Sequence, residues 1–226
     1  MWWNELHIIY KNTKHQSGQG RCSLTLLILF CSLFYINVWT QESYRNKSGT
    51  VYAGLLYGKG SQLLDFKTYN YNLLTCQGTL EYYVYSKGFF NISLLGLPQI
   101  NKSELKQNSG DSQHSGYEIG INLGILFKIQ LQNKYHLYSG FGIGPHYVTE
   151  TPHIQASGFI FSDNIYLGMS CNIYKALDIN FMYQFRHISN AGLKNPNLGI
   201  NNTIFSWGLN LKIRDAKNSY ENLHKT

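Results

Sequence analysis

Apolar and polar residues alternate along most of the second half of the chain. From Tyr117 to Leu131, the odd-numbered positions are apolar or aromatic, and the even-numbered positions are mostly polar or glycine. The same period recurs over Tyr135–Tyr147, Phe159–Ile173, Leu177–Ser189 and Thr203–Ile213. Because successive side chains of a β-strand point to opposite faces, this period of two predicts five long strands, each with one apolar and one polar face.

The predicted strands are long, and short turns join some of them. Strands of soluble proteins usually have about 3–10 residues, whereas tilted membrane-spanning strands need about 9–11 residues plus flanks. Turns of two or three residues are expected at Gln132–Lys134 and Tyr174–Lys175. The pattern therefore predicts an all-β fold, an eight-stranded antiparallel up-and-down transmembrane β-barrel.

The first half of the chain is less regular. We expect a strand over Val51–Gly58 and a hairpin formed by Leu73–Tyr85 and Phe89–Leu95. The stretch Asn101–Ser115 is rich in Ser, Gln and Lys, which is typical of a long loop. A short strand is also expected near Leu63–Tyr71.

One long apolar run, Leu24–Val38, lies near the start of the chain and follows Lys11, Lys14 and Arg21. It is shorter than the roughly 20 residues of a spanning helix, and a basic segment before a run of this length is typical of a secretory signal. The expected organisation is a signal peptide over residues 1–41, a barrel over 42–213 and a mobile polar tail over 214–226. An uncleaved N-terminal anchor is the alternative.

Composition narrows the class of protein and its partners. Charged residues make up 14% of the chain and aromatic residues 15%, with 18 Tyr, which suits a β-rich protein. The formal charge of +7 comes from scattered Lys and Arg. This spread favours a basic rim facing anionic lipid headgroups over nucleic-acid binding, with ordinary solubilising charge as the alternative. The sequence leaves the oligomeric state open.

Only Cys76 and Cys171 follow the predicted signal, so one disulfide at most can form, and two unpaired thiols are the favoured interpretation. The cysteines and histidines have no zinc-site spacing. We expect neither a metal nor another cofactor.

A histidine and a serine lie two residues apart at the end of one predicted strand. His187 and Ser189 continue the apolar stripe of Leu177, Ile179, Phe181, Tyr183 and Phe185, so all share one face, and the Cα atoms of the pair lie about 7 Å apart. An imidazole beside a hydroxyl offers a general base next to a nucleophile. On the lipid-facing wall of a barrel, this pair would meet an acyl chain that never leaves the bilayer. A solvated polar rim is the simpler alternative.

A side chain that could orient the imidazole of His187 is expected on the following strand. Asn201 shares its parity with Phe205 and Trp207, and a hairpin centred near Lys194 would place it opposite His187. An amide oxygen can accept the imidazole N–H, as it does in Cys-His-Asn hydrolases, although it brings no charge. Three further histidines lack such a partner, and we expect them in the barrel interior or in loops: His136, His146 and His153.

The run RHISNAGLKNPNLGIN, residues 186–201, resembles the outer-membrane lipid A 3-O-deacylase family, also called acyloxyacyl hydrolases. The resemblance extends over roughly Tyr117–Ile213. It implies an eight-stranded barrel in the bacterial outer membrane, with an active site on its lipid-facing wall and lipid A or a related membrane lipid as substrate. It also implies that His187 is the general base and Ser189 the nucleophile.

The same resemblance assigns supporting roles and exposes one departure. Asn197 corresponds to an oxyanion-stabilising side chain, helped by backbone amides from Asn190 to Gly192. The family's acidic residue would fall at Asn201, and no Asp or Glu lies between Ser189 and Arg214.

The resulting expectation is a serine hydrolase that removes an ester-linked acyl chain from lipid A, with weak activity because Asn201 replaces the acid. One alternative is a catalytically weak or inactive outer-membrane barrel with a structural or adhesion role. Another is a secreted lipocalin-like binder whose apolar face points inward.

Overall fold

The computed structural model describes residues 48–63, 69–107, 113–131 and 134–214. The predicted signal peptide and almost all of the predicted tail lie outside these residues. The described part contains eight strands: β1 (Val51–Gln62), β2 (Tyr69–Lys87), β3 (Phe90–Gln107), β4 (Gln113–Leu131), β5 (Tyr135–Val148), β6 (Gly158–Tyr174), β7 (Leu177–Ser189) and β8 (Ile200–Arg214). No helix among the described residues is both long and apolar enough to cross a membrane.

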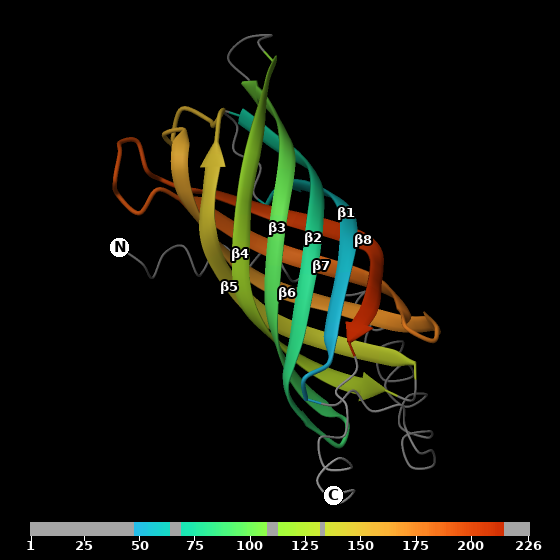
Figure 1. Cartoon of the computed structure of the whole chain (residues 1–226). Helices are drawn as coiled ribbons and strands as arrows, with labels where there is room; N and C mark the ends of the chain where they lie inside the picture. Colours follow the sequence, from blue (N-terminus) through green and yellow to red (C-terminus); the bar gives the residue numbers. More distant parts are fainter. Residues whose placement is uncertain (1–47, 64–68, 108–112, 132–133, 215–226) are drawn as a thin grey trace, which may run out of the picture. The chain divides into compact units, whose positions relative to one another are not determined.

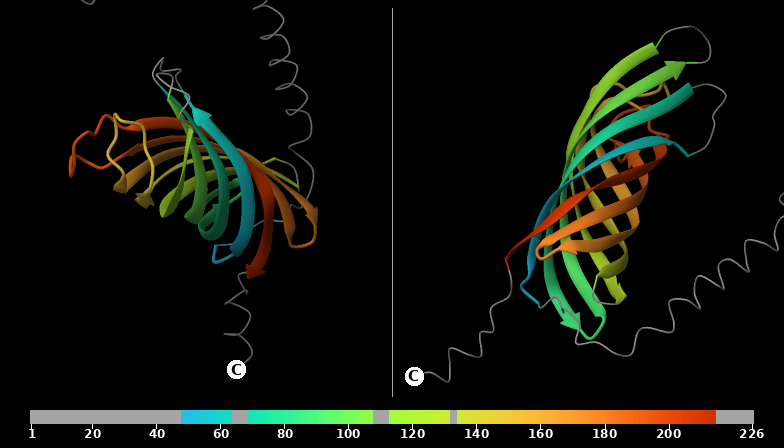
Figure 2. Two further views of the ribbon diagram at one scale, coloured as in Figure 1. Left: turned by 90° about the horizontal axis from the view of Figure 1, so that it is seen from above. Right: turned by 90° about the vertical axis from the view of Figure 1, so that its right-hand side faces the viewer.

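The eight strands close into a ring. Each strand pairs antiparallel with the next one in the chain, and β1 pairs with β8 (Figures 1 and 2). The predicted eight-stranded up-and-down barrel is therefore confirmed. We call the end that carries the β1–β2, β3–β4, β5–β6 and β7–β8 connections the loop end. The opposite end carries turns as short as two residues.

The two faces of the barrel wall differ in chemistry, as the alternation requires. In β5, exposed and buried side chains alternate at every position. Large apolar side chains cover the outside, among them Leu55, Leu80, Leu123, Phe141, Ile143 and Leu167. The buried inside is mostly polar, with residues such as Gln77, Gln99, Asn122, Asn164, Gln184 and Arg186. An apolar outer band is what a lipid environment requires, so the lipocalin-like alternative with an inward apolar face is wrong.

Two apolar clusters interrupt the polar interior. One lies at the loop end and contains Tyr69, Tyr71, Leu73, Leu105, Val148, Ile160, Ile188, Ile200 and Ile204. The other lies deeper and contains Leu56, Leu95, Leu97, Leu126, Tyr138, Tyr166 and Met182. Leu126 and Met182 break the alternation of their strands because both point into this second cluster. The clusters fill a barrel interior that is narrow enough for side chains alone to pack it.

The predicted short strand at Leu63–Tyr71 is wrong. Residues 69–71 are the beginning of β2, which continues without interruption to Lys87. The inward face of β2 is apolar at Tyr69, Tyr71 and Leu73 and polar from Thr75 to Glu81. Because the polarity of the two faces reverses along one strand, the sequence pattern looks like two elements.

The predicted loop at Asn101–Ser115 is also wrong over most of its length. β3 extends to Gln107 and β4 begins at Gln113, and the two strands stay paired from Asn101↔Glu118 to Lys106↔Gln113. The outward side chains near this end are polar, such as Lys102 and Glu104. A strand that extends past the apolar band has no reason to alternate, so its composition resembles that of a loop.

The two cysteines of the barrel are both free, as expected. Cys76 is exposed on the outer wall and Cys171 is half-buried. The barrel is therefore held by its hydrogen-bonded ladders and side-chain packing, with no covalent link between strands in its described part.

Candidate active site

The outer face of β7 carries His187 and Ser189 at the loop end of the barrel. Both side chains are half-buried, whereas the residues between and beside them, Arg186, Ile188 and Asn190, are buried. The buried residues point inward, and Ile188 belongs to the apolar cluster at the loop end. The imidazole and the hydroxyl therefore stand together on the outer wall, supported from behind by packed side chains.

Asn201 meets His187 directly across the β7–β8 ladder. The two residues are register partners, and His187 Nδ1 lies 2.8 Å from Asn201 Oδ1. The predicted hairpin register is thus confirmed. Since an amide oxygen can only accept, Nδ1 carries the proton and donates it, which leaves the lone pair of the ring on Nε2.

Gly199 determines where the other edge of the imidazole can lie. A Cβ added at this glycine would come within 2.9 Å of His187 Nε2 and still closer to Cε1, and its φ of +75° lies in the left-handed region. Glycine satisfies both demands because it has no Cβ and adopts positive φ freely. Nε2 therefore lies beside Gly199, the last residue of the β7–β8 connection, on the side of His187 toward which Ser189 also lies along β7.

The hydroxyl of Ser189 makes no side-chain hydrogen bond with any described residue, His187 included, and the side chain is half-buried. Ser189 is the last residue of β7 and pairs with Phe161 of β6. The ring of Phe161 stacks edge-on against Phe159, with ring centroids 5.1 Å apart. An aromatic wall therefore borders the serine on the side of β6.

The β7–β8 connection forms its own hydrogen bonds around Asn190 and Asn197. The Asn190 backbone N–H donates to Asn197 Oδ1 at 2.8 Å, and the Gly192 N–H donates to Asn190 Oδ1 at 3.0 Å. Two of the backbone amides predicted to stabilise an oxyanion thus already have acceptors. The NH2 group of Asn197 remains as a donor, because only its oxygen is used in the described contacts.

The β5–β6 connection supports this loop from the neighbouring side (Figure 1). Gln155 forms an isolated bridge with Asn197, and its side-chain oxygen accepts the Gly199 N–H at 3.0 Å. The Ala156 N–H donates to Pro196 O at 2.7 Å, and the Leu198 N–H donates to Ile154 O at 3.1 Å. These three hydrogen bonds, two of which form the bridge, fix the backbone of Asn197 and Gly199.

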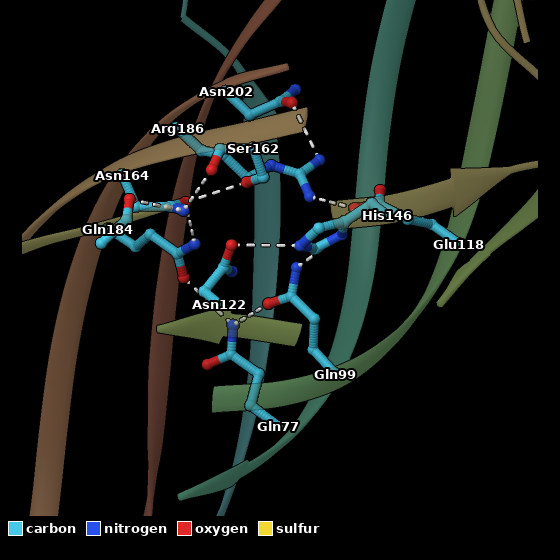
Figure 3. A network of polar contacts seen from close by, with 11 residues as sticks. Gln77, Gln99, Glu118, Asn122, His146, Ser162, Asn164, Gln184, Arg186 and Asn202 are labelled. Atoms are coloured by element: carbon cyan, nitrogen blue, oxygen red, sulfur yellow. Dashed lines mark hydrogen bonds and ion pairs between the residues drawn. The ribbon is translucent and has the colours of Figure 1, made fainter. Parts of the chain in front are cut away.

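The inner face of β7 is held by an extended polar network (Figure 3). Arg186, which precedes His187, donates to Glu118 of β4 at 2.5 Å and to Asn202 of β8 at 3.2 Å. Glu118 also accepts from His146 Nδ1 at 2.6 Å. Arg186 and Asn202 are register partners, next to the His187–Asn201 pair. The network thus fastens β7 to β8 directly behind the outward-facing pair.

His136 and His146 are buried inside the barrel, and His153 is exposed in the β5–β6 connection, as the sequence indicated. Among the described residues, no three His, Cys, Asp or Glu side chains cluster closely enough to hold a metal ion.

The structure adds one residue that sequence reasoning missed. Asp163 of β6 is the register partner of His187 on the side opposite Asn201, and its side chain is exposed on the outer wall. A signal was present in the sequence: Asp163 is the one charged residue in the apolar row Phe159, Phe161, Ile165, Leu167. Only the strand pairing reveals that this interruption falls beside the histidine.

The closed ring, the apolar outer band and the polar cluster on its wall define an outer-membrane β-barrel of the bacterial cell envelope. Residues 74–210 match the model of the family described as lipid A 3-O-deacylase (PagL). The chain belongs to this family. The matched segment includes His187, Ser189, Asn197 and Asn201.

Solved structures support the fold. The chain is similar to the neisserial surface protein A, with a TM-score of 0.50 and 13% identity, covering 74% of this chain and 97% of that one. It is also similar to OprG from Pseudomonas aeruginosa, with a TM-score of 0.47 and 10% identity, covering 76% of this chain and all of the other. At such identities the first likeness shows the fold alone. No curated protein sequence matches the chain.

Proposed function

We propose that this protein is a serine hydrolase that removes an ester-linked acyl chain from lipid A at the outer wall of its barrel. The observation that carries the proposal is the bond of 2.8 Å from His187 Nδ1 to Asn201 Oδ1 on the same face as Ser189. It leaves Nε2 as a base beside an unoccupied hydroxyl. Membership of the deacylase family supplies the substrate class.

In the proposed reaction, Ser189 Oγ attacks the ester carbonyl while His187 Nε2 removes the hydroxyl proton. The NH2 group of Asn197 donates to the oxyanion of the tetrahedral intermediate. The intermediate collapses when the sugar oxygen leaves with the proton from Nε2, and the acyl group stays on Ser189. Water, deprotonated by the same nitrogen, then releases the fatty acid and regenerates the serine.

Access to the ester from the bilayer follows from the position of the site. His187 and Ser189 lie at the loop end, and longer loops of outer-membrane barrels face the cell exterior. The apolar side chains Phe159, Phe161 and Phe185 flank the site on the outer wall. An acyl chain can lie against these rings while its ester reaches the serine at the membrane surface.

The test uses the refolded full-length barrel in detergent with purified lipopolysaccharide. Mass spectrometry of the extracted lipid A should show the loss of one acyl chain with the wild-type protein and with Ser61→Ala, a control serine exposed on the outer wall of β1. The variant Ser189→Ala should release none. Equal deacylation by Ser189→Ala would refute the proposal.

A barrel with a structural or adhesion role is the second candidate, because an uncharged Asn201 replaces the acid that the resemblance leads one to expect. A fluorophosphonate probe separates the two, since it labels only an activated serine. Labelling that depends on Ser189 and His187 supports the hydrolase. A folded barrel that stays unlabelled and leaves lipid A intact supports the structural role.

A further inference from the structure

The outer wall of β5 to β8 carries one carboxylate, that of Asp163. The other acidic residue in these four described strands, Asp178, is buried inside the barrel. On β6 the outward neighbours of Asp163 along the strand are Phe161 and Ile165, and across the β5–β6 ladder it faces Ile143. Apart from His187 on β7, the nearest outward positions therefore offer no charged partner.

His187 also has only one charged neighbour on the outer wall. Its outward neighbours are Phe185 and Ser189 on its own strand, Asn201 across one ladder and Asp163 across the other, and Gly199 covers its ring edge. Arg186 points into the barrel and is held by Glu118. Among these neighbours, Asp163 alone carries a charge.

The Asp163 carboxylate interrupts a row of apolar outward side chains, so its presence calls for an explanation. Side chains directly opposite each other in an antiparallel pair have Cβ atoms about 4.5–5.5 Å apart, close enough for opposite charges to interact. In a setting with apolar neighbours, such an interaction is screened less than it would be in water. The one charge that can arise beside Asp163 is that of a protonated His187.

We propose that Asp163 is a positioning residue that stabilises the imidazolium formed at His187, and thereby supplies from β6 the negative charge that Asn201 on β8 lacks. The inference rests on the proposed function. The two roles of a triad acid are then divided between strands: Asn201 fixes the tautomer through Nδ1, and Asp163 provides the charge. The proton that His187 takes from Ser189 stays on Nε2 until the leaving oxygen accepts it, and Asp163 takes no part in this transfer.

The first test is the pH profile of deacylation by Asp163→Asn, a nearly isosteric change. We expect kcat to fall about 10- to 100-fold at neutral pH, and the acid limb of the profile to move to lower pH by about one unit, because protonation of His187 loses its stabilising anion. Glu104→Gln, a charge removal on the outer wall of β3, is the matched control and should leave the profile in place. A barrel that is folded in both variants migrates as a compact, heat-modifiable band on a gel.

The second test adds an acid on the other side of the ring. Asn201→Glu should raise the activity of Asp163→Asn by a larger factor than that of the wild-type protein, since the two carboxylates serve the same imidazolium. Equal factors in both backgrounds would mean that Asp163 and His187 are uncoupled, and would overturn the proposal.

A third measurement does not depend on turnover. The ring Cε1–H signal of His187, followed by NMR in detergent micelles, should titrate at lower pH in Asp163→Asn than in the wild-type and Glu104→Gln proteins. If Ser189→Ala deacylates lipid A while this shift is present, the proposed function fails and the coupling stands. If the titration is the same in all three proteins, the role of Asp163 is refuted whatever the activity.

Discussion

Two histidines of this barrel have similar partners and opposite surroundings. His146 lies inside, with Nδ1 2.6 Å from Glu118 and Nε2 3.1 Å from Asn122. His187 lies on the outer wall, with Nδ1 2.8 Å from Asn201 and Nε2 without a partner among the described residues. His146 has the stronger partner, since a carboxylate bonds an imidazole more tightly than an amide does.

Residue types alone do not distinguish a structural histidine from a reactive one. Both nitrogens of His146 have partners and the ring is buried, so its cluster holds strands together. His187 retains one open nitrogen beside a free serine at the membrane surface. In the proposed reaction, the unpaired Nε2 of His187 is what allows the outer cluster to act as a base.

The largest expected effect separates these two histidines. His187→Ala should reduce the kcat of deacylation by about 10³- to 10⁴-fold, because the proposed general base is lost. Its resistance to urea in lipid vesicles should stay close to that of the wild-type protein. Activity assays and urea titrations on the same refolded samples measure both quantities.

His146→Ala is the matched change inside the barrel and should give the reverse result. Its loss leaves Glu118 and Asn122 without partners, which lowers the free energy of unfolding by about 1–3 kcal/mol. The kcat of the folded fraction should be retained. If His146→Ala abolished deacylation in a barrel of normal stability, the division between a structural and a reactive cluster would be wrong.

The second prediction addresses the ion pair behind β7. Glu118→Gln removes the carboxylate that holds Arg186, whose guanidinium is completely buried. An unpaired buried charge lowers the free energy of unfolding by about 3–5 kcal/mol. Urea unfolding in vesicles measures this change, with Glu104→Gln, at an exposed pair, expected within about 0.5 kcal/mol of wild type. Equal stability of the two variants would contradict a structural role for the interior network.

The third prediction tests the donor proposed for the oxyanion. Asn197→Asp keeps an acceptor for the Asn190 N–H, so the loop should persist, but it replaces the NH2 group by a negative oxygen. The kcat should fall by about 10²- to 10³-fold, as it does when an oxyanion donor is lost. Asn195→Asp places the same charge two residues away and should have a small effect. Similar losses of kcat in both variants would indicate that any negative charge in the loop lowers the rate. Asn197 would then not be a specific donor to the oxyanion.

The smallest expected effect concerns the space around the imidazole. Gly199→Ala introduces a methyl group against His187 Cε1 and Nε2, which displaces the ring and should lower kcat by about 10²-fold. Gly158→Ala is the control, because Gly158 also has a positive φ, of 107°, but no atoms near its added Cβ. Both variants carry the backbone strain, and only Gly199→Ala should lose activity. Equal activities would show that the ring is not confined by Gly199.

Long stretches of this fold could be predicted because one physical cause acts along them. Where a strand such as β5 has lipid on one side and a polar interior on the other, apolar and polar side chains must alternate, and the sequence shows it. Prediction failed at the loop end, where Tyr69 and Tyr71 turn an apolar face inward and Lys102 and Glu104 lie outside on a continuing strand. At that end the environments of the inner and outer faces of the wall change, while the strands stay paired by the same backbone hydrogen bonds.

The outward pair His187 and Ser189, and the opposing Asn201, could be located from parity and from the hairpin register. Parity within one strand, and the length of one loop, suffice for such local placements. The hydrogen bonds of the backbone amides in the β7–β8 connection could not be predicted in this way. The bonds of Asn190 and Gly192 depend on how the loop folds upon itself. The proposed catalytic roles of His187, Ser189 and Asn197 stay predictions.

The sequence by itself determined the class of fold, the lipid-facing side of each regular strand and the histidine–serine pair, because these follow from a period of two along the chain. Only the tertiary structure placed Asp163 next to His187, Gly199 against the imidazole and Arg186 between Glu118 and Asn202. Such contacts join residues from different strands, and their distances are set by the register in which the barrel closes.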